Sequence, residues 1–478
     1  LQELPNGTVR ANAYDALNRV NQIEHRGPGG PFARYEYTLG PNGNRLEVRE
    51  LDGRRVNYAY DALDRLVQET IADPVSGPRT IAYVMDGVGN RLLRNDSIEA
   101  QTTYTYDAND QLLSESLSSQ LSTLNTVYTY DANGNTLSKS NANESTEYEW
   151  NPENRLIAFR QFDASQALST TGQYQYDTDG IRVSSTVTEN GNTTETAYLV
   201  DANRPFAQVL EEWQSLNSQP STLNSSFTYG HHQPISQNRA GVRSYYHADH
   251  LGSTRALTGQ TGSPTDAYAF DAYGRTLRQA GPNENAYLFA GEQRDKQLGL
   301  DYLRARYLNI GAGRFYGRDM FFGNQLVPLS RNAYLYAYDD PIDNTDPSGL
   351  YTLADVVAAL AIQQNLTSLY VTKLAFGGLR ILIASEVSRR ILGPAARTQD
   401  KALRLIASGF YDPAVEDAYL NARQSYSFGI DLLQTGFALA DAAESAYALV
   451  NGANSVAKNL NKLSATGPET QNAHAEVI

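Results

Sequence analysis

The sequence predicts an all-β fold made of repeated hairpins, followed by a separate helical region at the C-terminus. Three observations lead to this prediction. The 478 residues include 32 Tyr but only 2 Trp and 2 Met, and Tyr favours the half-buried surfaces of strands. Aromatic residues recur at intervals of about 23 positions over the first 200 residues, which indicates a repeat architecture. From residue 351 this pattern is absent, and Ala and Leu become frequent.

The repeat is centred on the aromatic residue that ends each short aromatic strand. These residues are Tyr14, Tyr37, Tyr60, Tyr83, Tyr106, Tyr130, Trp150, Tyr176 and Tyr198. Their flanks also recur: Tyr-Ala-Tyr-Asp-Ala at 58–62 is followed by Tyr-Thr-Tyr-Asp-Ala at 104–108 and again at 128–132. A few positions later comes Asn or Gly, then Arg and an aliphatic residue, as in Gly-Asn-Arg-Leu at 89–92.

Each part of the motif has a structural meaning. Tyr-x-Tyr places two rings on one face of a strand, and the Asp carboxylate starts a turn by accepting hydrogen bonds from nearby backbone amides. Asn-Gly at 42–43 and 133–134 predicts the positive φ angles of tight hairpins. One hairpin cannot bury its own apolar face, so the repeats must stack side by side.

The size of the predicted sheet follows from the repeat count. Nine aromatic positions predict roughly 18 strands, which extend about 86 Å at about 4.8 Å per strand. A compact domain of 128 residues has a radius of gyration of about 14 Å, and hence a circumference of about 110 Å. The sheet is shorter than this circumference, so it makes less than one turn around such a domain. We therefore expect an open, curved sheet.

The motif and its period resemble the YD repeat of the Rhs (rearrangement hotspot) family, which includes the C components of insecticidal Tc toxins and the teneurins. The resemblance implies that residues 1–200 form a β-sheet spiralling into a shell. Residues 201–350 resemble the Rhs repeat-associated core domain, which plugs one end of that shell. The most specific motifs are Gly-Leu-Asp-Tyr-Leu-Arg-Ala-Arg-Tyr at 299–307, Gly-Arg-Phe at 313–315 and Asp-Pro-Ser-Gly-Leu at 346–350.

In this family the core is a self-cleaving aspartyl protease, and the C-terminal piece, usually a toxin, stays inside the shell. The resemblance implies a scissile bond between Leu350 and Tyr351. It also implies two catalytic carboxylates, on Asp319 and Asp346, with Arg318 in support.

This sequence departs from the family at the first aspartate. Many members continue as Asp-Pro-x-Gly there, whereas Asp319 precedes Met320 and lies 27 residues before the second aspartate. Asp340 is therefore an alternative partner, as are Asp339 and Asp343.

Peptide hydrolysis by two aspartates can also be argued from the residues alone, without the family resemblance. Two neighbouring carboxylates cannot both ionise easily, so one keeps a proton. The charged one can then accept a proton from water while the neutral one polarises the carbonyl, which hydrolyses a peptide without metal, Cys or Ser. The alternative is that 346–349 is only a turn, because Asp, Pro and Gly occupy the positions that a type I turn favours.

Three further groups of side chains have the chemistry of ligand sites. His247, Asp249 and His250 lie within four residues, but on a strand they point to both faces and need not converge on a metal. His231 and His232 fit a solvated turn. Arg304, Arg306 and Arg318 alternate with aromatic residues, and in an acidic protein we expect them to form salt bridges with strand carboxylates rather than to bind phosphate. We expect no metal and no cofactor.

Residues 351–478 read as a helical domain with a disordered tail. Apolar spacing predicts helices at 356–362, 400–406, 414–423 and 430–450. The region has a single His, His474, and no phosphate-binding glycine loop, so its activity stays open. Since C-terminal regions of the family vary, the resemblance transfers no toxin activity to it.

Composition limits the function classes. With 39 Lys+Arg against 53 Asp+Glu, the net charge is −14, which argues against a shell that binds nucleic acid. Cys is absent, so disulfides and thiol nucleophiles are excluded. No run of 18 apolar residues occurs, which argues against a simple transmembrane helix. The chain begins Leu-Gln-Glu, and we expect it to be an internal part of a longer polypeptide.

These observations favour the C-terminal part of a secreted or cell-surface Rhs-type polymorphic toxin. Its own C-terminal domain would be the cargo, released by autoproteolysis after Leu350, and an immunity protein and a secretion machinery would be its partners. The alternative is a non-catalytic surface or wall protein whose exposed Tyr faces bind carbohydrate. A third hypothesis is that 351–478 is itself an enzyme.

Overall fold

The computed structural model describes residues 1–119, 123–204, 206–230, 233–320, 323 and 328–350. Contacts divide the chain into two compact units, and all described residues belong to the unit that contains Leu1–Val357. The only helical segments among them are three 3-10 turns, η1 (Phe289–Gly291), η2 (Pro328–Arg331) and η3 (Ala337–Asp339). The described part is therefore almost all β. The helical domain predicted for 351–478 lies outside the described residues.

The large sheet has 25 strands. Its first half comprises β1 (Gln2–Glu3), β2 (Val9–Tyr14), β3 (Val20–Gly27), β4 (Gly30–Leu39), β5 (Arg45–Glu50), β6 (Arg55–Tyr60), β7 (Leu66–Asp73), β8 (Gly77–Met85), β9 (Arg91–Asp96), β10 (Ala100–Tyr106), β11 (Leu112–Ser118) and β12 (Thr123–Tyr130). Its second half comprises β13 (Thr136–Ser140), β14 (Glu144–Trp150), β15 (Leu156–Asp163), β16 (Leu168–Tyr176), β17 (Arg182–Glu189), β18 (Asn192–Asp201), β19 (Gln208–Leu216), β20 (Thr222–Tyr229), β21 (Pro234–Arg239), β22 (Val242–Ala248), β23 (Thr254–Thr258), β24 (Pro264–Phe270) and β25 (Thr276–Ala280).

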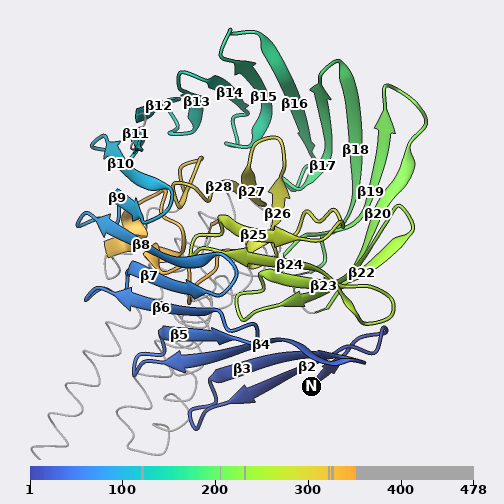
Figure 1. Cartoon of the computed structure of the whole chain (residues 1–478). Coiled ribbons are helices and arrows are strands. Elements are labelled where there is room, and N and C mark those ends of the chain that lie inside the picture. The colour runs from blue at the N-terminus through green and yellow to red at the C-terminus, as the bar shows by residue number, and fades with distance from the viewer. Residues whose placement is uncertain (120–122, 205, 231–232, 321–322, 324–327, 351–478) are drawn as a thin grey trace, which may run out of the picture. The chain divides into compact units, whose positions relative to one another are not determined.

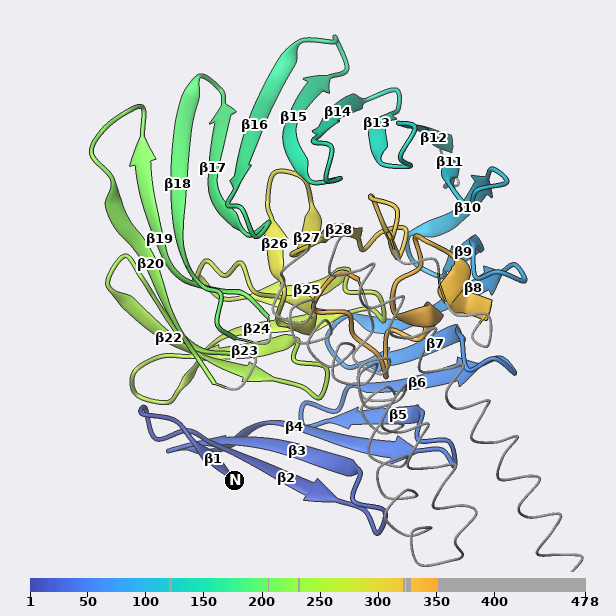
Figure 2. The same cartoon turned by 180° about the vertical axis from the view of Figure 1, so that it is seen from behind.

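Strand order in this sheet is the order of the sequence. Each strand pairs antiparallel with the one before it, from β1 to β25, so the sheet is one long meander (Figures 1 and 2). It has more strands than the predicted 18 because it continues past residue 200. The reason is local: Asp249 and Asp271 form the same turn as the Asp residues of the repeats, each accepting a hydrogen bond from the amide two residues on.

The turns of the repeats confirm the role predicted for Asp. Oδ1 of Asp61 accepts hydrogen bonds from the amides of Leu63, at 2.9 Å, and Arg65, at 3.0 Å. The positive φ falls on one residue late in each turn, as at Gly43 with 100° and Gly134 with 89°. The prediction of two positive φ angles in each Asn-Gly pair was wrong, because the Asp-anchored turn needs only one left-handed residue.

The tyrosine rings of the repeats point into the protein. Tyr104, Tyr128, Tyr148 and Tyr174 are at most 6% exposed and pack in one apolar cluster. The second aromatic of the motif joins neighbouring repeats instead: the Tyr106 hydroxyl donates to a carbonyl of the preceding return strand at 2.8 Å. The same bond recurs at Tyr60, Tyr130, Trp150 and Tyr176. Buried rings of this kind do not favour the carbohydrate-binding alternative.

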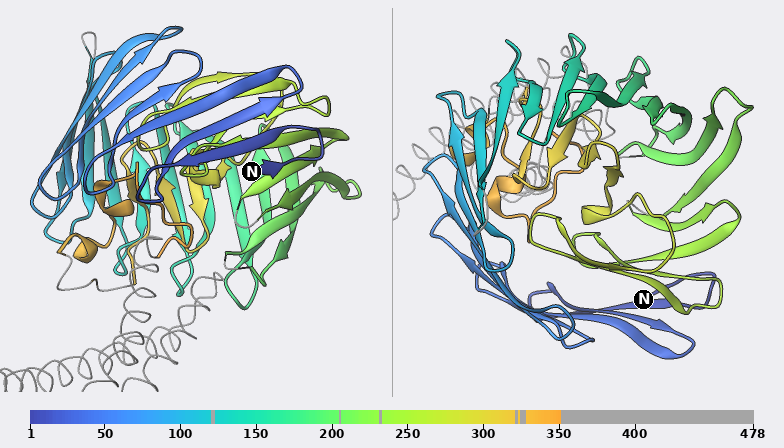
Figure 3. Two further views of the ribbon diagram at one scale, coloured as in Figure 1. Left: turned by 90° about the horizontal axis from the view of Figure 1, so that it is seen from below. Right: turned by 45° about the horizontal axis from the view of Figure 1, so that its top comes forward.

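A second, four-stranded sheet lies within the curve of the large one (Figure 3). It consists of β26 (Gln293–Asp295), β27 (Leu300–Leu303), β28 (Arg306–Asn309) and β29 (Arg314–Phe315). We call residues 281–350 the inner segment. Tyr302, Tyr307 and Tyr316 of this segment belong to the same cluster as the repeat tyrosines, so the repeats provide the wall against which the inner segment packs.

The two ends of the large sheet contact each other through side chains. We call this contact, between β2–β7 and β22–β25, the seam. Arg255 donates to both carboxylate oxygens of Glu50 at 2.8 Å, and Glu69 accepts from the Ala272 amide at 3.1 Å. Since β1 and β25 do not pair with each other, the sheet remains open, and the seam is closed by side chains: by charges and hydrogen bonds, and by apolar packing of Leu66 against Ala272 and Tyr273.

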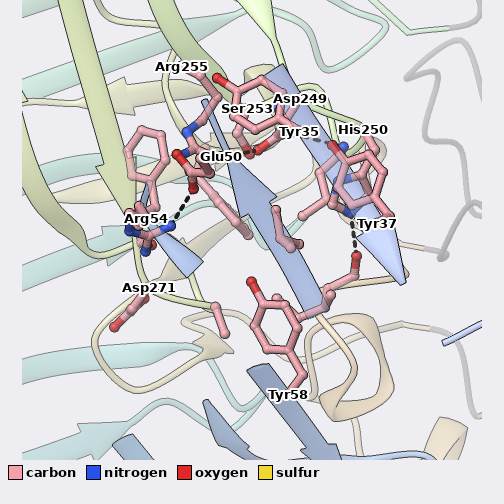
Figure 4. Close-up of a pocket in the computed structure, with 16 residues that line it drawn as sticks. Tyr35, Tyr37, Glu50, Arg54, Tyr58, Asp249, His250, Ser253, Arg255 and Asp271 are labelled. Atoms are coloured by element: carbon pink, nitrogen blue, oxygen red, sulfur yellow. Dashed lines mark hydrogen bonds and ion pairs between the residues drawn. The ribbon is translucent and has the colours of Figure 1, made fainter. Parts of the chain in front are cut away.

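Figure 4 shows the charged cavity at the seam. Glu50, Arg54, Arg255 and Asp249 line it together with tyrosine rings. Its volume of about 40 Å³ leaves room for a few water molecules but not for an organic ligand. We therefore regard it as a structural charge network and look for the functional site elsewhere.

Candidate functional site

The motif Asp-Pro-Ser-Gly-Leu at 346–350 forms a tight turn closed by its first residue. Oδ1 of Asp346 accepts hydrogen bonds from the Ser348 hydroxyl at 2.9 Å and from the Leu350 amide at 3.1 Å. The Gly349 amide donates to the Asp346 carbonyl at 3.2 Å. The turn predicted from sequence is thus present, and its carboxylate reaches Leu350. Tyr351 lies outside the described residues.

The β27–β28 hairpin holds this turn from one side. The Ala305 amide donates to the Ser348 carbonyl at 3.2 Å, while Arg304 and Arg306 donate to the carbonyls of Pro347 and Gly349. Gly349 has a φ of 72°, and a Cβ there would lie 2.3 Å from a backbone oxygen of the hairpin. Glycine is therefore required at this position for two reasons, its backbone conformation and the close approach.

Asp319 and Asp346 are brought to the same arginine. Nη2 of Arg306 lies 2.8 Å from Oδ2 of Asp319 and 3.5 Å from Oδ2 of Asp346. Asp319 follows β29, and its backbone is anchored by the hydrogen bond from its amide to the Ala333 carbonyl at 2.7 Å. Two carboxylates from separate parts of the inner segment therefore meet beside Leu350.

The surroundings prepare Asp346 to carry a proton. Its side chain is buried, and burial raises the pKa of the carboxyl to about 7, against the opposing effect of the Arg306 guanidinium. The nearby Asp319 carboxylate also raises this pKa. A carboxyl with such a pKa is a mixture of acid and carboxylate at neutral pH, which suits proton transfer.

The other residues suggested by the sequence lie in different surroundings. Arg318 packs against Gly134, near Tyr334. Asp340 accepts a hydrogen bond from the Asn344 side chain at 3.1 Å, and after burial the largest influence on its pKa is Asp343, which raises it. The structure thus associates Asp319, rather than Asp340, with Asp346.

Asp339 and Asp343 also lie away from the turn. Asp339 faces the repeats at Gly89, and burial raises its pKa to about 7. Asp343 forms an ion pair with Arg45 of β5. Both carboxylates thus connect the inner segment to the shell.

Sequence reasoning missed the roles of Arg306 and Glu292. Arg304 and Arg306 do pair with carboxylates, since Arg304 Nη1 lies 2.6 Å from Glu292 Oε2 and Arg306 contacts Asp319 and Asp346. These carboxylates lie outside the strands, whereas the sequence had predicted partners within strands. Burial raises the pKa of Glu292 to about 7. No feature of the neighbouring sequence indicates that Arg306 and Glu292 lie beside residues 346–350. A motif rich in Arg and Tyr looks the same wherever its partners lie in the fold.

His247, in β22, and His250, just after it, do not converge on one point. His247 contacts Thr258 at 2.8 Å, and His250 contacts the Ile342 carbonyl at 2.8 Å. Asp249 instead pairs with Arg255 at 3.3 Å. Across the described ranges, no three His, Asp or Glu side chains are grouped so as to hold a metal ion. His231 and His232 lie outside the described residues.

Comparisons with known proteins point to one family. Residues 88–193 match the family described as Teneurin YD-shell. The tRNA3(Ser)-specific nuclease WapA of Bacillus spizizenii is 32% identical over 218 residues, which is 45% of this chain and 9% of that protein. The toxin protein Tse5 of Pseudomonas aeruginosa is 30% identical over 121 residues, or 24% of this chain and 9% of that protein. These matches support an Rhs/YD-repeat protein.

Among solved structures, the complex TcdB2-TccC3-Cdc42 resembles this chain with a TM-score of 0.38 and 17% identity, covering 72% of this chain and 21% of that one. This chain spans 9% of the length of the WapA and Tse5 proteins named above. In the part of the chain that the structure describes, no helix has the length and hydropathy needed to cross a bilayer.

Proposed function

We propose that this chain is the shell and self-cleaving core of an Rhs-type toxin, with residues 351–478 as the enclosed cargo. The single observation that carries the proposal is the meeting of Asp319 and Asp346 at Arg306 beside Leu350. The toxin-related family and the inward-facing tyrosine rings are consistent with a container. The expected immunity protein, secretion machinery and release to the outside of the cell remain predictions.

The proposed reaction is hydrolysis of the peptide bond between Leu350 and Tyr351. Asp319, at 2.8 Å from the guanidinium, is favoured as the charged carboxylate and accepts a proton from the attacking water. Asp346 in its protonated form polarises the Leu350 carbonyl. The water oxygen adds to the carbonyl carbon, the C–N bond breaks, and the departing nitrogen takes up a proton to become the new amino terminus.

The test is expression of the full chain followed by a denaturing gel and intact-mass measurement. We expect two pieces, residues 1–350 and 351–478. Asp319→Asn and Asp346→Asn should each leave the chain intact, while Asp340→Asn should be cut as the wild type is. A wild-type chain that stays whole, or a cut at another bond, would remove the proposal.

Enclosure is a separate part of the proposal and has its own test. After cleavage, the two pieces should co-elute in native size-exclusion chromatography. Added protease should digest 351–478 more slowly in the native complex than in the same fragment expressed alone. Equal digestion rates would mean that the shell does not shield the cargo.

A further inference from the structure

Arg306 occupies the centre of the candidate site. The residue is 5% exposed, and its Nη2 faces both Asp319 and Asp346. Its Nε donates to the Gly349 carbonyl, and its Nη1 donates to the Ala333 carbonyl at 3.1 Å. One guanidinium therefore connects four groups: the two carboxylates, the Gly349 carbonyl before Leu350, and the Ala333 carbonyl, which also accepts from the Asp319 amide.

The Phe315 ring also holds the guanidinium of Arg306 in place. Its central carbon lies 3.7 Å from the centroid of the Phe315 ring, a stacked geometry that suits a planar cation. Arg keeps its charge at all relevant pH values, and its rigid fork can bind several oxygens at once. Lys has one nitrogen and cannot reproduce these four contacts.

We propose that Arg306 is the positioning residue of the self-cleavage, holding Asp319 charged and in reach of the bond that follows Leu350. This inference rests on the proposed function. In a pair of carboxylates without a cation, the second ionisation is opposed by the first. Here the guanidinium offsets one negative charge, so the two carboxylates need not share a proton directly.

Arg304 provides a matched control. It comes from the same hairpin and donates to the Pro347 carbonyl of the same turn, but its charged partner is Glu292. A substitution at Arg304 therefore loosens the turn without removing the cation between the two aspartates.

The experiment follows cleavage of the full chain made by short cell-free translation, stopped and transferred to buffers of different pH. Arg306→Gln should slow cleavage by about 10- to 100-fold. It should also shift the rising limb of the pH profile to higher pH, because the carboxylates lose a stabilising cation. Arg306→Lys, which keeps the charge but not the fork, should be slow with a smaller shift. Arg304→Gln, which loosens the turn, should slow cleavage without moving the pH profile.

The outcomes separate this inference from the proposed function. If the wild type is not cut, the proposed function fails. If the wild type is cut, and Arg306→Gln is cut at the same rate with the same pH profile, only the role of Arg306 fails. Circular dichroism checks that Arg306→Gln folds, and if it does not, Arg306→Lys with wild-type rate and profile would overturn the inference.

A second, independent observation concerns two histidines at the seam. His25 of β3 and His247 of β22 lie 222 residues apart in sequence, yet their Nδ1 atoms are 3.3 Å apart. Both residues are at most 2% exposed. The outer nitrogen of His25 contacts the Ala248 carbonyl at 3.0 Å, and that of His247 contacts the Thr258 hydroxyl at 2.8 Å.

The directions of these hydrogen bonds define the protonation state. A carbonyl only accepts, so Nε2 of His25 carries hydrogen, and Nδ1 of a neutral His25 then accepts from Nδ1 of His247. Nε2 of His247 accepts from the Thr258 hydroxyl, which in turn accepts from the Asn6 side chain at 2.8 Å. The chain is complete with two neutral rings. A change of tautomer could accommodate one added proton, but two would place both Nδ1–H groups against each other.

We propose that His25 and His247 form a latch that keeps the seam closed at neutral pH and weakens it in acid. The other groups that act on the pair are Arg10 of β2, whose charge opposes protonation of both rings, and the Tyr35 ring of β4, 6.4 Å from His25. Asp249 attracts Arg10. Arg10 thus places a positive charge beside the two rings. Among the described residues, neither ring has a carboxylate as a direct partner.

The sign of the pH effect follows from the lowered pKa values. Burial, reinforced by Arg10, lowers the pKa of His25 to about 4, and burial with the neighbouring His25 lowers that of His247 to about 2. Exposed imidazoles titrate at about 6.5, so the open seam binds more protons as the pH falls below that value. The closed seam is therefore most stable above about pH 6.5, and the free energy needed to open it falls progressively as the pH decreases toward about 4.

The test is hydrogen exchange of the full chain at pH 7.5 and pH 5, measured by mass spectrometry and corrected for intrinsic rates. We expect peptides from β2–β3 and β22–β23 to lose protection at pH 5, while β10–β16 keep theirs. In His25→Gln/His247→Gln, which cannot be charged, the loss should be at least several-fold smaller. Glu50 does not confuse the result at pH 5, because Arg255 and Arg54, against burial, keep its pKa below the usual value.

His250→Gln is the comparison at the same seam, since the His250 ring packs on Tyr37 of β4 and contacts the Ile342 carbonyl but not His25. Because burial also lowers the pKa of His250, this variant should lose part of the acid response, and the His25→Gln/His247→Gln variant should lose more of it. Unchanged protection of the wild-type seam at pH 5, or equal losses in the wild type and the double variant, would overturn the latch. If the double variant does not fold, the single His247→Gln decides by the same comparison.

Discussion

The repeat strands and the inner segment satisfy their buried polar groups in different ways. In the repeats the partners are close in sequence: Tyr60 donates to a carbonyl 15 residues away, and Asp61 binds amides of its own turn. In the inner segment they are distant, as for Asp343, whose ion pair with Arg45 spans 298 residues. The comparison teaches that the wall is built by local rules, while the seam and the packing of the inner segment depend on long-range contacts, both charged and apolar.

The largest expected effect is therefore at the seam. Arg255 is buried between Glu50 and Asp249, with side chains that are at most 10% exposed. Arg255→Met should lower the free energy of unfolding by about 3–5 kcal/mol, because buried Asp249 loses its cation and Glu50 keeps only Arg54. Urea unfolding of the full chain measures the change.

The contrasting variant lies one residue before Glu50. Arg49 also pairs with a carboxylate, Glu47, but its own side chain is 54% exposed. Arg49→Met should leave the unfolding curve unchanged, since exposed pairs contribute little. If both variants were equally stable, the distinction between local wall and long-range closure would not hold for stability.

An intermediate effect is expected at Asp340. Burial raises the pKa of this carboxyl to about 8, and its Oδ1 has no hydrogen-bond partner among the residues that the structure describes. In the unfolded chain the group ionises near pH 4, so the folded state binds the additional proton. Stability should therefore fall as the pH rises from about 4 to about 8.

Asp340→Asn removes this proton uptake. The variant should be more stable than the wild type by about 1–3 kcal/mol at pH 8, with no difference near pH 4, as measured by urea unfolding at each pH. A gain that is the same at all pH values would mean that the raised pKa is not its cause.

Much of the wall could be predicted from the sequence, because each signal lies within a few residues of its effect. The Tyr-x-Tyr strands, the Asp turns and the turn at Asp346 are all of this kind. The role of Arg306 could not be assigned, since nothing near it in the sequence indicates which carboxylates its guanidinium contacts. The seam was missed for the same reason: the contact between His25 and His247 arises only when the curvature of many strands brings the ends together.

The smallest expected effect tests the local rule itself. Tyr106→Phe removes one hydroxyl that donates to the Arg91 carbonyl at 2.8 Å between neighbouring repeats. It should lower the free energy of unfolding by about 1 kcal/mol, because a buried carbonyl loses its donor while the ring packing stays. Tyr14 holds the same position in the first repeat but is 53% exposed, so Tyr14→Phe should have no measurable effect. Matching losses in the two variants would mean that the hydroxyl acts through something other than the bond between repeats.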